Sequence, residues 1–215
     1  MDDFPNFSVK NYDDVRNDIR SGDILLCSGN SIFSNMIKTA TQSVWSHVAF
    51  ILRLDIIDRI MVLESVESIG VRAVPLSSYA RDYNGTGAGY PGRIMIARHN
   101  QLQQKNIPDL SKTAVDRLGY PYNPEECARI AARISANSIG LKTSCPDVQT
   151  GREFICSEYA ELCFKSVGIT VDYNPMGFIA PADFARCKEV SGLFYIQTGA
   201  STPVSINSMR EHIPA

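Results

Sequence analysis

The most informative part of this sequence is Phe154-Ile155-Cys156-Ser157-Glu158-Tyr159-Ala160, where a short apolar run stops at a cysteine. From Cys156 onward, apolar residues recur at the spacing of one helical face: Ala160, Cys163, Phe164 and Val167. The pattern predicts a helix with Cys156 in its first turn, on the stripe that faces the core. The unpaired N–H groups and positive potential of a helix N-terminus favour a thiolate over a thiol. Cys156 is therefore a candidate nucleophile, and a buried structural cysteine is the alternative.

A candidate base lies far upstream, in the β-branched and aromatic run Ser43–Leu52, which predicts a buried strand with His47 near its start. The next predicted strand is Ile60–Val66, and the short polar break between the two indicates an antiparallel hairpin. Paired residue numbers then have a constant sum. A turn centred on Asp55-Ile56 gives 111 and pairs His47 with Glu64, whereas a turn two residues later gives 113 and makes Glu64 a diagonal neighbour on the same face.

In either register Glu64 is a candidate for orienting the imidazole and stabilising its charged form. The alternative is a solvated cross-strand ion pair at a sheet edge. Glu67 has the opposite strand parity and is expected to point away, unless a bulge intervenes. Neither other histidine is placed to serve Cys156, because His99 ends a predicted edge strand and His212 lies near the end of the sequence.

Taken in order, these motifs resemble the circularly permuted, YiiX/YebB-like branch of the NlpC-type papain-like hydrolases. The resemblance rests on Gly22-Asp23-Ile24-Leu25, Ser46-His47-Val48, Val62-Leu63-Glu64, Gly70-Val71 and Phe154-Ile155-Cys156-Ser157-Glu158, and it covers about Ser21 to Val190. In ordinary papain-like enzymes the cysteine helix precedes the histidine strand; in that branch it follows. The resemblance implies Cys156 as nucleophile, His47 as base and Glu64 as orienting residue. The related retinol-acyltransferase pattern, Asn-Cys-Glu-His, is not matched here, so acyl transfer between lipids is not directly supported.

Composition excludes several classes of function. The 215 residues carry a net charge of −2, with 44% hydrophobic and 20% charged residues, so there is no electrostatic case for nucleic acid or an anionic membrane. The acidic start, Met1 to Pro5, lacks the pattern of a signal peptide, and no apolar run approaches the roughly 18 residues of a membrane span. Six scattered cysteines, with no Cys-x-x-Cys pair, fit a reducing compartment. We therefore expect a cytoplasmic protein without a metal or cofactor.

The predicted fold class is α+β: a papain-like fold with circular permutation, whose antiparallel sheet or partial barrel packs against helices. The whole chain, 1–215, is expected to form one domain, with a core at about 21–198 and a tail at 199–215. Strands are predicted at 23–27, 48–53, 60–66, 70–74, 93–98 and 193–197, and helices at 11–20, 32–40, 75–80, 110–118, 125–138 and 182–187, besides the cysteine helix.

The predicted activity is that of a thiol hydrolase acting through an acyl-enzyme on Cys156. The resemblance implies small peptides of cell-wall type, or amino-acid amides, as substrates. An acyl-ester or lipid substrate is the alternative, suggested by the apolar face of the predicted helix Ile32–Ala40, which is otherwise an ordinary amphipathic helix packed on the sheet. A non-catalytic binding module is a third reading. The glycine-rich segment Asn84–Gly92 has no following Gly-Lys-Ser/Thr, so it is read as a loop, with a lid over the cleft as one possibility.

Overall fold

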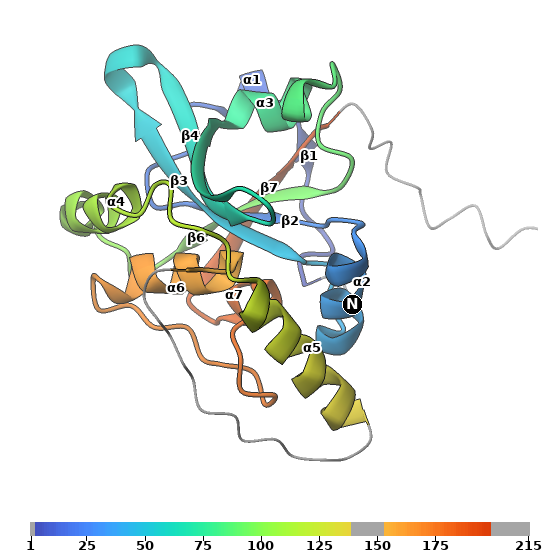
Figure 1. Cartoon of the computed structure of the whole chain (residues 1–215). Helices are drawn as coiled ribbons and strands as arrows, with labels where there is room; N and C mark the ends of the chain where they lie inside the picture. Colours follow the sequence, from blue (N-terminus) through green and yellow to red (C-terminus); the bar gives the residue numbers. More distant parts are fainter. Residues whose placement is uncertain (1–2, 139–152, 199–215) are drawn as a thin grey trace, which may run out of the picture.

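A computed structural model of the chain describes residues 3–138 and 153–198. Within these ranges seven strands form one open sheet in the order β1-β7-β6-β2-β3-β4-β5 (Figure 1). Every neighbouring pair is antiparallel except β1 and β7, which are parallel. The predicted α+β class is correct, and the sheet is mixed and open rather than a partial barrel. The strands are β1 (Val9–Lys10), β2 (Ile24–Cys27), β3 (His47–Leu54), β4 (Arg59–Val66), β5 (Gly70–Pro75), β6 (Ile94–His99) and β7 (Val190–Ile196).

Helices cover both faces of this sheet. In Figure 1, α3 lies on one side of the strands and α6 and α7 lie together on the other. The α-helices are α1 (Tyr12–Val15), α2 (Ile32–Thr41), α3 (Leu76–Arg81), α4 (Ile107–Val115), α5 (Pro124–Ser138), α6 (Cys156–Lys165) and α7 (Pro181–Arg186). Short 3₁₀ turns are η1 (Asp55–Ile57), η2 (Tyr83–Gly85) and η3 (Gln104–Asn106).

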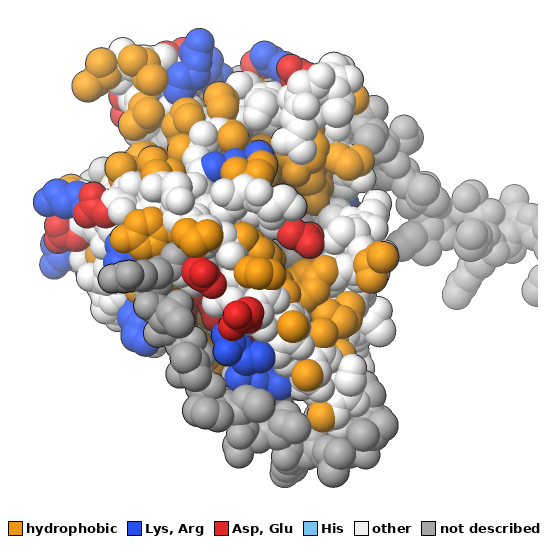
Figure 2. Space-filling model, viewed as in Figure 1, with side chains coloured by type: hydrophobic (Ala, Val, Ile, Leu, Met, Phe, Trp, Pro, Cys, Tyr) orange, Lys and Arg blue, Asp and Glu red, His pale blue; other side chains and the backbone are white. Residues whose placement is uncertain are grey.

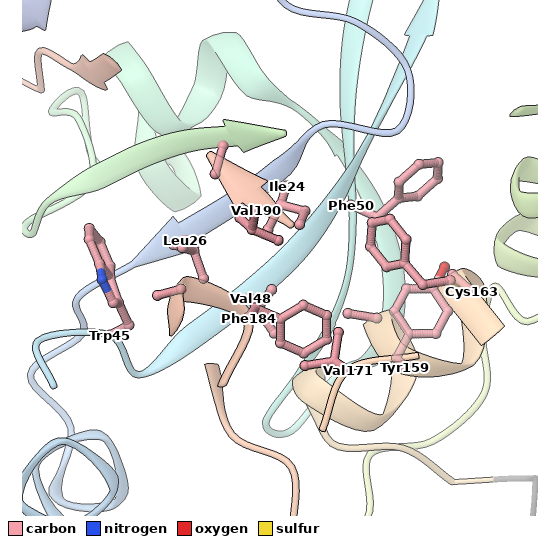
Figure 3. Packing of buried hydrophobic residues seen from close by; sticks show 14 of the residues in the cluster. Ile24, Leu26, Trp45, Val48, Phe50, Tyr159, Cys163, Val171, Phe184 and Val190 are labelled. Carbon is pink, nitrogen blue, oxygen red and sulfur yellow. The ribbon is translucent and has the colours of Figure 1, made fainter. Parts of the chain in front are cut away.

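The central strand β2 is buried along its whole length, because both faces of the sheet are covered. Its alternate side chains belong to different core clusters: Ile24 and Leu26 pack on the side of α6, and Leu25 and Cys27 pack on the side of α3. The same alternation in β3 places Val48 and Phe50 on the side where Tyr159 and Cys163 of α6 lie (Figure 3). By strand parity, His47 shares the face of Cys27, towards α3.

Most predicted elements are present, with three differences. The first predicted helix is shorter, since α1 ends at Val15, although Val15 and Ile19 are buried as expected. The strand that ends at His99 is not an edge, because β6 pairs with β2 on one side and β7 on the other. Strand β1 was not predicted. The apolar run before Cys156 makes only an isolated bridge, from Phe154 to Tyr122. The predicted tail at 199–215 lies outside the described residues.

Helix α2 begins where it was predicted, with the Ser31 hydroxyl accepting the Ser34 N–H at 3.1 Å. Its apolar face, however, is not packed on the sheet as an ordinary amphipathic helix would be. Ile32 is 91% exposed, Phe33 and Met36 are only partly buried, and Ile37 is the one large residue of this face in the core. Figure 2 shows hydrophobic side chains on the surface in the region of α2 and α5.

No helix in the described ranges combines the length and the apolar character that crossing a membrane requires.

Candidate active site

The histidine and the glutamate meet across the β3–β4 hairpin. The observed register pairs Phe50 with Leu63 and Ile51 with Val62, a constant sum of 113. The direct pairing of His47 with Glu64 is therefore wrong, and the diagonal arrangement is correct. The cause is the length of the connection, because η1 and the left-handed residue Asp58 carry the turn further along the chain. His47 Nε2 lies 2.6 Å from Glu64 Oε2.

Glu64 is completely buried and accepts hydrogen bonds on both carboxylate oxygens. Tyr79 donates its hydroxyl to Oε2 at 2.6 Å, and Arg72, its cross-strand partner in β5, donates Nε and Nη2 to Oε1, each at 2.9 Å. Burial alone would raise the pKa of Glu64, but the bonds from His47 and Tyr79 and the charges of His47 and Arg72 lower it overall. The carboxylate is therefore ionised, and the solvated surface ion pair considered for it is wrong.

Cys156 is the first residue of α6, so the prediction that it lies in the first helical turn is confirmed. The helix start is fixed by Glu158, whose carboxylate accepts the Ile155 N–H at 3.2 Å. Ser65 of β4 donates its hydroxyl to the Phe154 carbonyl at 2.6 Å, which ties the segment before the helix to the glutamate strand. Further along, Cys163 is fully buried, whereas Cys156 is partly exposed.

His47 is hydrogen-bonded to Glu64 and lines the pocket together with Cys156, close enough for the thiol to affect its pKa. Because Nε2 faces Glu64, Nδ1 is the ring nitrogen available to the thiol. Burial would lower the pKa of His47, but the hydrogen bonds and negative charges of Cys156 and Glu64 outweigh it and raise the pKa to about 10. The imidazole is consequently protonated at neutral pH.

A pocket of about 340 Å³ opens over these residues and is lined by Cys156 and His47. Its wall contains neutral polar groups, among them Ser46, whose hydroxyl accepts the Gly29 N–H at 2.7 Å. Asp23, from the motif Gly22-Asp23-Ile24-Leu25, is not in this wall and instead pairs with Arg98 at 2.6 Å. The glycine-rich segment Asn84–Gly92 borders the pocket through Asn84, Tyr90 and Pro91.

Glu67 also lines this pocket, contrary to the prediction that it points away. Strand β4 ends at Val66, so Glu67 belongs to the turn before β5 and strand parity does not apply to it.

The other described thiols and the second histidine are unlike the candidate pair. Burial raises the pKa of Cys163 to about 12 and that of Cys127 to about 11, and it also raises the pKa of Cys27 and Cys187. His99 is buried and does not line the pocket, and burial lowers its pKa. His212 and Cys145 lie outside the described residues.

Comparison with protein families identifies the class of protein. Residues 18–143, more than half of the chain, match the family described as permuted papain-like amidase enzyme, YaeF/YiiX, C92 family. The chain belongs to this family and is a cysteine peptidase or amidase-type hydrolase. The permuted papain-like branch was predicted correctly, although C92 describes it more accurately than NlpC-type. The matched range includes His47 and Glu64 and ends before Cys156.

Among solved structures, the chain is similar to the crystal structure of metalloprotein yiiX from Escherichia coli O157:H7. The identity is 18%, the match covers 81% of this chain and 96% of the other, and the TM-score is 0.57, so the likeness concerns the fold. No curated protein matches the sequence.

Because that similar protein is described as a metalloprotein, we asked whether this chain has a donor set for a metal ion. Within residues 3–138 and 153–198, no group of three or more His, Cys, Asp and Glu side chains is arranged to hold one. In the candidate site, moreover, Nε2 of His47 and both oxygens of Glu64 are already engaged by protein groups. The described residues therefore do not fit a metal ion.

Proposed function

We propose that the protein hydrolyses an amide bond of a small peptide or amino-acid amide through an acyl-enzyme on Cys156. The thiolate attacks the carbonyl carbon, and the tetrahedral oxyanion accepts the N–H of Cys156, one of the N–H groups that a helix start leaves unpaired. The His47 imidazolium gives its proton to the leaving amine. His47 then takes a proton from water, which attacks the thioester and releases the acid and the free thiolate.

The observation that carries this proposal is that His47 lines one pocket with Cys156 and is hydrogen-bonded to a fully buried carboxylate that also accepts from Tyr79 and Arg72. A buried anion stabilises the imidazolium far more than a solvated one, because little water screens it. Glu64 would thus act as the orienting residue, Cys156 as the nucleophile and His47 as the acid and base. The family description as an amidase supports an amide as the substrate.

The size of the pocket supports a small substrate, such as a peptide of cell-wall type. Its 340 Å³ falls at the lower end of the range of ordinary ligand sites, roughly 300–1,000 Å³. We propose further that the chain is one cytoplasmic domain, which favours recycled or intracellular peptides over the intact wall.

The test is to trap the acyl-enzyme. Incubation with a metabolite extract, followed by acid quench and mass spectrometry of the Cys156 peptide, should show a mass increase equal to the acyl group. Cys156→Ala should show none, and His47→Ala should slow turnover by roughly 10²–10⁴, the scale of losing a general acid–base group. An unmodified peptide with every extract and every amide donor would contradict the proposal.

One observation favours a second candidate, hydrolysis of an acyl ester. Ile32 is 91% exposed beside Ser31 and Phe33, which line the pocket, so an apolar surface adjoins the candidate site. A fatty-acyl ester would then release a fatty acid, whereas the first proposal predicts release of an amine. If the thiol is reactive but neither product forms with any acyl donor, the chain is a binding module that has kept the fold.

A further inference from the structure

The turn between β4 and β5 is hydrogen-bonded to the segment Gly119–Tyr120 of the same chain. Val71 donates its N–H to Tyr120 O at 2.8 Å, and Gly119 donates its N–H to Val71 O at 2.9 Å. Gly70 has φ +88°, and a Cβ there would lie 2.1 Å from Tyr120 O, so only glycine allows this approach. The turn that carries Glu67 is therefore fixed beside the segment that leads into Tyr122.

Glu67, Tyr122 and Cys156 all line the pocket. The tyrosine pKa is raised by burial first and then by negative charge on Cys156, Cys127 and Glu67. Burial likewise raises the pKa of Cys127, and the charges of Cys156 and Glu67 add to this effect. Because Glu67 and Cys156 line one pocket, the carboxylate borders the space that an acyl group on Cys156 would enter. The effect of both residues on the partly buried Tyr122 and Cys127 agrees with this placement.

Nothing in the described part of the chain neutralises the charge of Glu67. Among the described residues it has no hydrogen-bond or ion-pair partner, whereas the other charged side chains of the pocket wall, His47 and Arg72, both hold Glu64. The remaining polar side chains of the wall carry neutral hydroxyl or amide groups: Asn30, Ser31, Ser34, Ser46, Ser65, Tyr79, Tyr83, Asn84, Tyr90 and Tyr122. No cation of the wall is left to bind a substrate carboxylate, and one anion is left to bind a substrate cation.

We propose that Glu67 binds a free ammonium group of the acyl donor, so that the substrate is an amide of an amino acid or a peptide that carries an unblocked amine. The inference rests on the acyl-enzyme chemistry proposed above and names its substrate class. The alternative is that Glu67 is an ordinary solvated surface carboxylate, which would have no effect on substrate preference.

The test compares donors that differ only in this charge. Benzyl thioesters of glycine and of 6-aminohexanoic acid carry a near and a distant ammonium, and their N-acetyl derivatives carry none. The initial rate of acyl-Cys156 formation, read by intact mass, should favour at least one free amine over its acetylated partner by about tenfold, the scale of one partly desolvated charge pair.

Glu67→Gln should abolish this preference while changing the rates of the acetylated donors by less than about twofold. The matched control is Glu125→Gln, which removes an exposed carboxylate of α5 outside the pocket wall and should retain the preference. Acylation that proceeds equally fast with free and acetylated donors, or a preference that survives in Glu67→Gln, would overturn the inference.

A second measurement separates this inference from the chemistry. In Cys156→Ala, which cannot be acylated there, binding of glycinamide and 6-aminohexanamide and of their N-acetyl forms is followed by NMR titration. A preference for a free amine that is lost when Glu67→Gln is added supports the inference. This holds even if no thioester acylates the wild-type protein, because a failure of acylation contradicts only the acyl-enzyme proposal. Equal binding of free and acetylated amides overturns the inference.

Discussion

His47 carries a proton in the resting site, because Cys156 and Glu64 together raise its pKa to about 10 against the effect of burial. A raised pKa in the folded state means that the stabilisation by this charge is fully present below the unfolded value, about 6.5. It is lost as the pH rises through about 10. The same deprotonation removes the acid that the leaving amine needs.

We therefore expect kcat/KM to fall at alkaline pH with a midpoint near 10. In Glu64→Gln one of the causes that raise the pKa of His47 is gone, so the alkaline limb should move to lower pH. The measurement is a pH profile of kcat/KM for both proteins, with Glu125→Gln as a charge-matched control. If the alkaline limb of the kcat/KM profile has the same midpoint in Glu64→Gln as in the wild type, the titrating group is not His47.

The thiols should differ sharply in reactivity. Limiting iodoacetamide near pH 6 should label Cys156 well ahead of Cys163 and Cys187, because burial raises the pKa of the latter two and keeps them protonated. Peptide mapping after a short pulse gives the order of labelling. Equal labelling of all sites, or no labelling until the protein unfolds, would mean that Cys156 is an inert structural thiol.

At the scale of elements, the β3–β4 hairpin determines which glutamate faces His47. With a register sum of 113, Glu64 lies on the His47 face, while Glu67 follows the end of the strand. With a neutral, N-acetylated donor, Glu64→Gln should lower activity markedly and Glu67→Gln should lower it much less. Both variants are measured side by side, together with thiolate labelling at pH 6. A larger loss in Glu67→Gln would show that the orienting carboxylate has been assigned wrongly.

The parts of the site that depend on local periodicity were predictable from the sequence. Helical spacing after Phe154 places Cys156 at the start of α6, and strand alternation keeps His47 and Glu64 on one face whether the register sum is 111 or 113. The register itself was not predictable, since it depends on how tightly the connection at Asp55–Asp58 turns.

Two further partners of the site were missed for related reasons. Arg72 reaches Glu64 only because β5 pairs with β4 in one register, and that register depends on the turn with left-handed Ser68 and Gly70. Its charge, opposite a buried strand carboxylate, was the available signal. Tyr79 comes from α3, and nothing in its sequence surroundings indicates that its hydroxyl reaches Glu64.

At the scale of the whole molecule, α6 connects the candidate site to the core. Phe164 is fully buried, with its ring centroid 5.8 Å from that of His99 in β6 and 6.3 Å from that of Phe184 in α7. Phe164→Ala should lower the free energy of unfolding by about 3–5 kcal/mol, through lost burial and a residual cavity. Urea denaturation measures this, with Val115→Ala, at a side chain that is 43% exposed, as the control. A loss below about 1 kcal/mol would mean that the core around α6 is not packed as described.

The parallel pairing of β1 with β7 places Val9 beside Tyr195 and Lys10 beside Ile196, so the first and last strands of the described chain are neighbours. Because the two strands are parallel, the end of β7 lies beside the end of β1 and not beside its start, so a linker that joins them must run back along this edge of the sheet. With such a linker the polypeptide could be reopened between α5 and α6 without breaking any strand pairing. In that rearranged gene product the cysteine helix would be synthesised first and the histidine strand second, the order of ordinary papain-like enzymes. The order in which these residues are synthesised is thus independent of their final arrangement, so either order of the cysteine helix and the histidine strand can form the same fold.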